Sequence, residues 1–260
     1  MSPVALITGA ARGIGAASAA ALAGAGFSLV LMDLCADEPS VPYPLGTPEE
    51  LQATAEACGG VPVQGDVRRQ DDLDRAVSVA LERFGGLDVA VAAAGVVVGG
   101  MEGWKTDDQH WDTVHGVNVA GVWRLARAAV PAILSRPEPR GGRFIAVSSV
   151  AGSTGLPLLA AYSSSKHAVV GFVKSLAVEL GPTGVTANVV APGSTATAML
   201  RASAAVYGLA DENEFAVHHP TGRLVSPDEV AAMVSWLAGP DSSAVTGAVL
   251  PVDAGMSATN

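Results

Sequence analysis

The chain has 260 residues, 49% of them hydrophobic, and a formal net charge of −10 at pH 7. This length can bury one sizeable core, and the negative charge disfavours nucleic acids and other polyanions as partners. The two cysteines lack the spacing of a metal site or a disulfide framework, and neither a secretory signal nor a bilayer-spanning stretch is present, so we expect a cytoplasmic protein that binds no metal and no membrane.

The chain begins with the pattern of a phosphate-binding turn. The apolar run Val4–Thr8 predicts a buried strand, and a glycine-rich turn and an alanine-rich helix at Gly13–Gly24 follow it. Backbone N–H groups and a positive helix end then meet at one point, which suits a pyrophosphate. The glycine spacing departs from the usual dinucleotide pattern, and a turn without a ligand is the alternative. The predicted contacts are Gly9, Arg12, Gly13, Ile14 and Gly15.

The second predicted strand, Ser28–Asp33, ends in a carboxylate eighteen residues beyond Gly15. A carboxylate at that place accepts a hydrogen bond from the adenosine ribose and repels a 2′-phosphate, so Asp33 favours NAD over NADP. Arg12 argues the other way, because a cation can pair with that phosphate. No second cation follows Asp33, and we therefore expect NAD as the cofactor.

Strands and helices go on alternating along the rest of the chain. Further strands are predicted at Val61–Gly65, Val89–Ala93, Arg143–Ser148, Thr186–Val190 and Ala248–Val252. Further helices are predicted at Pro48–Cys58, Gln70–Phe84, Asp107–Ala132, Ala160–Leu180 and Asp228–Ala238. Continuous apolar strands are typical of a sheet covered on both faces. We expect an α/β fold: a Rossmann-like, doubly wound parallel sheet of about seven strands, as one domain over residues 1–260, with ligands beyond the carboxyl ends of the strands.

Small or polar residues at those carboxyl ends extend the predicted cofactor site. The pair after the third strand suits the adenine ring, and small side chains after the fourth strand let a ring or ribose approach. The predicted cofactor residues from these ends are Leu34, Asp66, Val67, Ala93, Ala94, Gly95, Pro192, Gly193, Thr195 and Thr197.

Tyr162 and Lys166 lie one turn apart on the helix predicted at Ala160–Leu180, so both side chains project from one face. A neighbouring ammonium favours the phenolate, and lowering a tyrosine pKa from about 10 toward 7 takes roughly 4 kcal/mol. The pair predicts an acid/base group. The alternative is a surface lysine beside a half-buried tyrosine.

Asn118 falls on the apolar stripe of the helix predicted at Asp107–Ala132. A buried amide destabilises the fold unless it is hydrogen-bonded. Two interpretations stay open: a neighbouring carbonyl satisfies the amide, or the amide organises a water molecule or Lys166.

With Asn118, Ser149, Tyr162 and Lys166 in this order, the chain resembles the short-chain dehydrogenase/reductase family over essentially its whole length. The supporting motifs are Thr8-Gly9-x-x-x-Gly13-Ile14-Gly15, Asp66-Val67, Tyr162-x-x-x-Lys166 and Pro192-Gly193. The resemblance implies that Tyr162 exchanges a proton with the substrate oxygen and that Ser149 hydrogen-bonds the same oxygen. It also implies that Lys166 holds the nicotinamide ribose and lowers the Tyr162 pKa, while Asn118 supports a proton-relay water. Homotetramers are usual in this family.

Two departures from the family pattern stand out. Ala92-Ala93-Ala94-Gly95 replaces the usual Asn-Asn-Ala-Gly and removes an amide that ties the cofactor region together in relatives. The proline-containing insertion 34–47 resembles the mycofactocin-associated, carveol-dehydrogenase-like branch, which implies an external electron carrier. It is either a solvated loop or a segment that folds over the adenosine end and slows NAD exchange.

The substrate pocket is expected to be apolar, with residues 194–220 as a lid. Its predicted residues are Val96, Val98, Ser149, Leu156, Leu159, Met199, Leu200 and Tyr207. This composition favours a secondary alcohol or ketone of terpenoid, steroid or cyclic type, interconverted by hydride transfer. The alternatives are a 3-oxoacyl-thioester reductase, which needs a basic patch for its acidic carrier, and a nucleotide-sensing protein without turnover.

Overall fold

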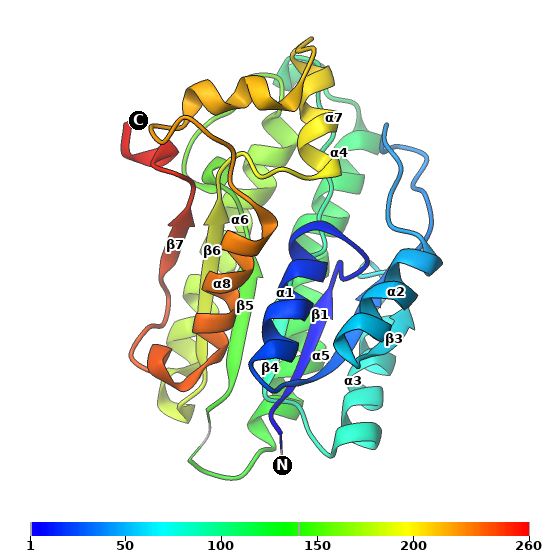
Figure 1. The fold of residues 1–260 in the computed structure, drawn as a ribbon, viewed down its shortest axis with the longest axis vertical. Helices are drawn as coiled ribbons and strands as arrows, with labels where there is room; N and C mark the ends of the chain where they lie inside the picture. Colours follow the sequence, from blue (N-terminus) through cyan, green and yellow to red (C-terminus); the bar gives the residue numbers. More distant parts are fainter. Residues whose placement is uncertain (1, 140, 260) are drawn as a thin grey trace.

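The computed structural model describes residues 2–139 and 141–259. Within these residues, seven parallel strands form one sheet in the order β3-β2-β1-β4-β5-β6-β7, with helices on both faces (Figure 1), so the predicted fold is confirmed. The strands are β1 (Val4–Thr8), β2 (Ser28–Asp33), β3 (Val61–Gln64), β4 (Val89–Ala92), β5 (Arg143–Val147), β6 (Thr186–Pro192) and β7 (Val249–Val252). The α-helices are α1 (Gly13–Gly24), α2 (Pro48–Cys58), α3 (Gln70–Phe84), α4 (Asp108–His115), α5 (Gly121–Leu134), α6 (Ala160–Leu180), α7 (Ala198–Val206) and α8 (Pro227–Ala238).

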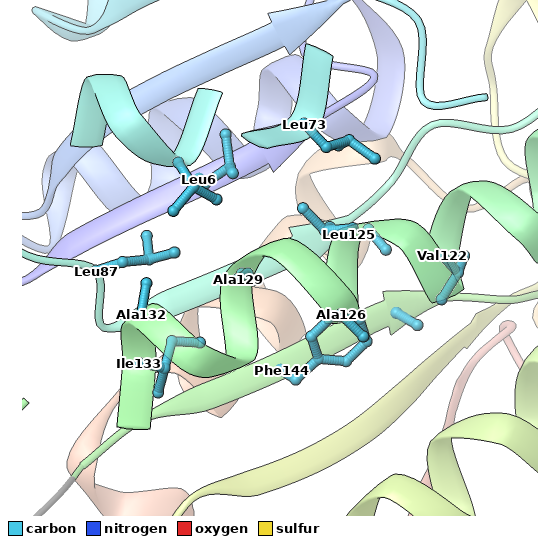
Figure 2. Packing of buried hydrophobic residues seen from close by; sticks show 14 of the residues in the cluster. Leu6, Leu73, Leu87, Val122, Leu125, Ala126, Ala129, Ala132, Ile133 and Phe144 are labelled. Atoms are coloured by element: carbon cyan, nitrogen blue, oxygen red, sulfur yellow. The ribbon is translucent and has the colours of Figure 1, made fainter. Parts of the chain in front are cut away.

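Alternate residues of the central strands face opposite layers of helices. Leu6 and Phe144 pack with side chains of α3, α5 and α6, whereas Ile7 and Ile145 pack with side chains of α1, α2 and α8. Figure 2 shows the α5 helix lying along the first of these layers, with Leu125 among its buried residues. Full burial of one such large side chain stabilises the fold by about 1.5–3 kcal/mol. Both faces are therefore apolar, which explains why the strands lack an alternating polar pattern.

The helix predicted at Asp107–Ala132 is divided into three parts. A π-helical turn, η2 (Gly116–Ala120), separates α4 from α5. A π turn places one extra residue in the helix and often marks a functional position. At the start of α5 the helix runs so close to the end of β3 that a Cβ atom on Gly121 would lie 2.8 Å from a methyl carbon of Val67.

The continuous helical run Asp108–Leu134 is long and apolar enough, by composition, to cross a membrane. In the fold, 44% of its most apolar window is buried, and Leu125, Ala129 and Ile133 pack in the core between the helices and the sheet. Burial against the sheet accounts for the apolar character of this run.

Two helical elements between β6 and α8 were not predicted. The helix α7 begins after Thr197, whose side chain accepts a hydrogen bond from the Leu200 N–H, and a 3₁₀ segment, η5 (Glu212–His218), follows it. Both lie within the segment predicted as a lid. At the other side of the site, β1 and β4 are neighbours although the chain leaves them in opposite directions across the sheet. This is the switch point at which doubly wound sheets bind ligands.

Candidate active site

The glycine turn after β1 lies directly beside the end of β4. Gly9 has a φ of +71°, and a Cβ atom there would lie 2.7 Å from the Cα of Ala94, so only glycine fits. A Cβ on Gly15 would lie 1.9 Å from the carbonyl oxygen of Gly9, which confirms close packing of α1 on the turn. No described side chain caps the first turn of α1. Its N–H groups therefore remain available to an anion.

Asp33 is fixed at the end of β2 by the turn itself. Its carboxylate accepts hydrogen bonds from the Ala11 N–H at 3.0 Å and the Cys35 N–H at 3.3 Å. The insertion passes over it, since a Cβ on Gly46 would lie 3.1 Å from an Asp33 oxygen. The Arg12 guanidinium donates to the carbonyl of Pro44 in the same insertion. The cation that argued for a 2′-phosphate is thus engaged by the chain, which strengthens the preference for NAD.

Asp66, predicted at the adenine ring, is paired with Arg68. The Arg68 Nε lies 2.9 Å from one Asp66 oxygen, and Arg68 Nη1 lies 2.6 Å from Glu38 of the insertion. Hydrogen bonding to Asp66 is the main cause that raises the pKa of Arg68. The sequence analysis missed both Arg68 and Glu38. Asp66 and Arg68 lie two residues apart just after β3, and this pair of opposite charges was a signal for the site.

Ser149, Tyr162 and Lys166 come together as predicted. Ser149 caps the short helix η3 (Val150–Gly152), and a hydrogen bond from its side chain lowers the pKa of Tyr162, although burial outweighs this and raises the pKa above its ordinary value. The Lys166 ammonium lies 5.6 Å from the centre of the Tyr162 ring and donates to the Val147 carbonyl at 3.0 Å.

This arrangement differs from the expected acidic phenol. Lys166 is 4% exposed, and burial lowers its pKa to about 8. Its charge is directed at a carbonyl rather than at the hydroxyl of Tyr162. Among the protein's own groups burial therefore dominates, and the phenol is favoured over the phenolate. A cationic ring bound beside Tyr162 would act in the opposite sense.

Asn118 lies in the π turn η2 and is fully buried. Its side-chain oxygen accepts from the Val96 N–H at 2.9 Å, and its amide nitrogen donates to the Val96 carbonyl and to Ser165 Oγ, both at 3.0 Å. The first of the two interpretations therefore holds, because the neighbouring backbone satisfies the amide. Asn118 also faces the same point as Lys166: a Cβ on Gly95 would lie 3.4 Å from Asn118 Oδ1 and 3.5 Å from Lys166 Nζ.

Two adjoining cavities open beyond the carboxyl ends of the strands. The glycine cavity, of about 640 Å³, is lined by the glycine turn and the ends of β2 and β3. The tyrosine cavity, of about 820 Å³, is lined by Ser149, Tyr162 and Lys166 together with apolar side chains. The two cavities have five residues in common: Ile14, Ala93, Gly95, Thr197 and Met199. They are therefore continuous, and Asn118 lines neither of them.

The predicted cofactor residues divide between these cavities. The glycine cavity holds Gly9, Arg12, Gly13, Ile14, Gly15, Asp33, Leu34, Asp66, Val67, Ala93, Ala94, Gly95 and Thr197. Tyr162, Lys166, Pro192, Gly193 and Thr195 line the tyrosine cavity. A Cβ on Gly13 would meet only Thr197, at 3.5 Å, so the turn leaves open space there. An uncapped helix end, this open cradle and a carboxylate at the far end fit an elongated dinucleotide.

Most of the predicted substrate residues line the tyrosine cavity. Leu156, Leu159, Met199, Leu200 and Tyr207 line the tyrosine cavity, as do Leu209 and Phe215 of the predicted lid. Val96 and Val98 are corrections: Val96 lines the glycine cavity, and Val98 is buried in a separate cluster with Val41 and Val114. Val97 lines the tyrosine cavity instead. The loop is irregular, so regular alternation of side chains along the chain did not identify this residue.

The insertion 34–47 is folded onto the site rather than solvated. Val41 is 7% exposed and packs with Val96, Val98 and Ala161, and Tyr43 packs against the same cluster. Ser40 Oγ lies 2.7 Å from Oγ1 of Thr113 on α4. The insertion therefore spans the distance from the Asp33 end of the site to the loop after β4.

Comparison with known proteins agrees with this chemistry. A family model described as enoyl-(acyl carrier protein) reductase matches residues 9–257. A Mycobacterium tuberculosis protein named as an NAD-dependent oxidoreductase is 39% identical over 97% of this chain and 94% of its own length. (−)-trans-Carveol dehydrogenase of Rhodococcus erythropolis is 35% identical over 97% of this chain and 96% of its own. The crystal structure of carveol dehydrogenase from Mycobacterium avium in complex with NAD has a TM-score of 0.93 at 34% identity, with 98% of each chain covered.

Proposed function

This chain belongs to the short-chain dehydrogenase/reductase family and is an NAD-dependent oxidoreductase, and from that premise we propose that it interconverts a secondary alcohol and a ketone on a mainly apolar substrate. The observation that carries the proposal is the placement of Tyr162, Ser149 and Lys166 on one wall of an apolar cavity that continues into the glycine cavity. NAD would be held by the glycine turn and Asp33 at one end and by Lys166 near the other.

The proposed chemistry divides between the cofactor and the chain. Bound nicotinamide supplies or accepts the hydride at the carbinol carbon. Tyr162 moves the proton: its O–H gives the proton to the substrate oxygen in ketone reduction, and its phenolate takes it back in alcohol oxidation. Ser149 donates a hydrogen bond to the same oxygen as negative charge develops there. Lys166, fixed by the Val147 carbonyl, would hold the nicotinamide ribose.

The shape and polarity of the tyrosine cavity support an apolar substrate. Apart from the catalytic group, its walls are mostly aliphatic or aromatic, including Leu156, Leu159 and Phe215. The phenol of Tyr207 donates to the Pro157 carbonyl at 2.7 Å, and its ring lies 5.9 Å from that of Phe215 in an edge-on contact. These contacts join the predicted lid to the loop before α6. A cyclic or terpenoid alcohol of modest size matches such a wall.

A 3-oxoacyl-thioester reductase is the second candidate, because the matching family model is described by an acyl-carrier-protein substrate. The exposed basic group available for an acidic carrier is the pair Arg124 and Arg127, which lie 5.8 and 5.7 Å from the ring of Trp123. A net charge of −10 opposes binding of an acidic carrier, so the alcohol dehydrogenase is the better-supported function.

The proposal is tested by a screen of cyclic and terpenoid alcohols with NAD, run with and without an artificial electron acceptor, beside a 3-oxoacyl thioester with NADH. Turnover of the alcohols supports the proposal, and turnover of the thioester alone supports the second candidate. A requirement for the acceptor would support the external electron carrier. Tyr162→Phe should bind NADH normally and lose at least about 100-fold in rate. Unchanged activity would remove Tyr162 from the mechanism.

We also propose that copies of the chain associate through α4, α5 and α6, as in the tetramers of this family. Large apolar side chains are exposed there, with Trp111, Trp123 and Val178 at 40%, 45% and 80% exposure. Both cysteines are free, which fits the cytoplasmic compartment expected from the sequence. Light scattering gives the mass of the assembly, and a monomer at micromolar concentration would refute the association.

A further inference from the structure

The loop after β4 forms a wall that the two cavities share. Gly95 lines both cavities, Val96 lines the glycine cavity and Val97 lines the tyrosine cavity. A cofactor in one cavity and a substrate in the other would therefore touch consecutive residues of one backbone segment. The position of Gly95–Val97 sets the distance between them, so whatever fixes this loop affects both.

Two side chains hold this loop by its backbone. Asn118 forms hydrogen bonds with both the backbone N–H and the backbone carbonyl of Val96. The next N–H, that of Val97, donates to the phenol oxygen of Tyr43 at 3.0 Å. Tyr43 comes from the insertion, 54 residues earlier in the chain. The insertion thus supplies one of the two anchors of the wall, and the two anchors approach it from different elements.

The end of β4, just before this loop, offers few side-chain contacts of its own. Ala92 and Ala93 have no side-chain amide, and the Ala94 N–H donates to Thr8 Oγ1 at the long distance of 3.4 Å. Packing keeps Tyr43 in place, because its ring lies against the cluster of Val41, Val96 and Val98. The hydrogen bond to Val97 is therefore formed by a side chain with little freedom to move away.

Tyr43 also lines the glycine cavity. Burial raises the pKa of Tyr43 to about 12, so the group keeps its proton at neutral pH. Within residues 2–139 and 141–259 no protein group accepts that proton. The oxygen of Tyr43 accepts from Val97, and the proton remains available to an oxygen atom of a ligand in the cavity.

We propose that Tyr43 is a positioning residue: it fixes the Gly95–Val97 wall between the NAD and substrate sites. Its action on the substrate rests on the proposed function, whereas its action on NAD does not. The insertion is then part of the reaction centre, in addition to its contacts at the Asp33 end.

Tyr43→Phe tests this directly, since phenylalanine keeps the packing and removes only the oxygen. Thr183→Val is the matched control, because it removes a side-chain hydroxyl that also accepts from a backbone N–H, that of Val185 at 3.3 Å, and lies outside both cavities. Two measurements use the whole protein without a substrate: NADH binding by fluorescence, and hydrogen exchange of the peptide that covers residues 94–101. Neither depends on whether the alcohol screen succeeds.

Tyr43→Phe should weaken NADH binding about tenfold and speed exchange in the 94–101 peptide while the rest of the chain stays protected. Thr183→Val should leave NADH binding within about twofold. Wild-type binding and exchange in Tyr43→Phe would overturn the proposal. Faster exchange throughout the chain, or equal weakening of NADH binding by Thr183→Val, would also overturn it, because the role would then be general stability.

Discussion

The two ends of the NAD site are built from different kinds of contact. At the nicotinamide end, Asn118 and Lys166 are 0% and 4% exposed, and both bond to backbone groups of neighbouring strands and loops. At the adenosine end, Arg68 forms ion pairs with Asp66 and Glu38, and the side chains of Arg68 and Glu38 are 32% and 15% exposed. Buried backbone contacts fix geometry for proton and hydride transfer, whereas partly exposed charges hold a ligand with strength that salt can change.

The largest effect is expected from Asn118→Ala at the nicotinamide end. The change removes three hydrogen bonds and leaves both polar groups of Val96 buried without a partner. We expect the free energy of unfolding, measured with urea, to fall by about 4 kcal/mol. Ser165→Ala, which removes one of these bonds, should cost about 1 kcal/mol. Equal losses in the two variants would show that the bonds to Val96 contribute little.

Lys166→Met should change how stability depends on pH. Burial lowers the pKa of Lys166 to about 8 in the fold, against about 10.4 for an unfolded chain. Between these values the unfolded chain binds the extra proton, so wild-type stability rises with pH across that window.

The methionine side chain does not titrate, so the variant lacks this contribution of Lys166 to the pH dependence of stability. Without NAD, the wild type should therefore gain about 3 kcal/mol of unfolding free energy relative to Lys166→Met between pH 8 and pH 10.4. Urea titrations at several pH values measure the difference. Parallel stability curves for the two proteins would mean that Lys166 is not desolvated in the folded chain.

Substitutions of Asp33 test its charge and its hydrogen bonds at the adenosine end. Asp33→Asn removes the charge that repels a 2′-phosphate and keeps one acceptor oxygen, for either the Ala11 N–H or the Cys35 N–H. We expect the preference for NAD over NADP, as a ratio of kcat/KM values, to fall about tenfold. Asp33→Ala should relax the preference and also weaken both cofactors, because the turn loses its acceptor. A strictly NAD-selective Asp33→Asn would refute the role of this carboxylate.

The regular part of the fold was predictable because its signals are local. The strand β2 and the helices α2 and α6 begin and end at the predicted residues. For α2 the reason is visible: the Thr47 side chain accepts from the Glu50 N–H, the Glu50 side chain accepts from the Thr47 N–H, and Gly59 follows in a left-handed conformation. The Tyr162–Lys166 pair was equally predictable, since helix geometry alone places both side chains on one face.

The rest depends on contacts between distant segments. The π turn at Gly116–Ala120 adds one residue to the helix without disturbing its apolar stripe. The helical spacing of apolar residues in the sequence therefore could not reveal the turn. The loop of Val97 has no period, and the direction of its side chains follows from Asn118 and Tyr43. Arg68 pairs locally with Asp66, whereas its contact with Glu38 depends on the path of the insertion. Both ends of the NAD site therefore contain features that local sequence patterns could not predict.

The smallest effect is expected at that insertion, whose proposed role is to slow NAD exchange. Glu38→Gln removes the charge that holds Arg68 and the insertion over Asp66. A partly exposed ion pair of this kind is a weak tie, so NADH should dissociate about threefold faster by stopped-flow fluorescence, and the rate should lose most of its dependence on salt. Glu102→Gln is the matched control, because it breaks the exposed pair with Lys105 outside both cavities.

The control variant should release NADH at the wild-type rate and with the wild-type salt dependence. If the wild type loses all nicotinamide on dialysis and turns over freely with added NAD, the insertion does not retain the cofactor. Tyr43 would then be the functional contact of the insertion, and Arg68 would serve only to shape the loop. The adenosine end would in that case select the cofactor through Asp33 without controlling its release.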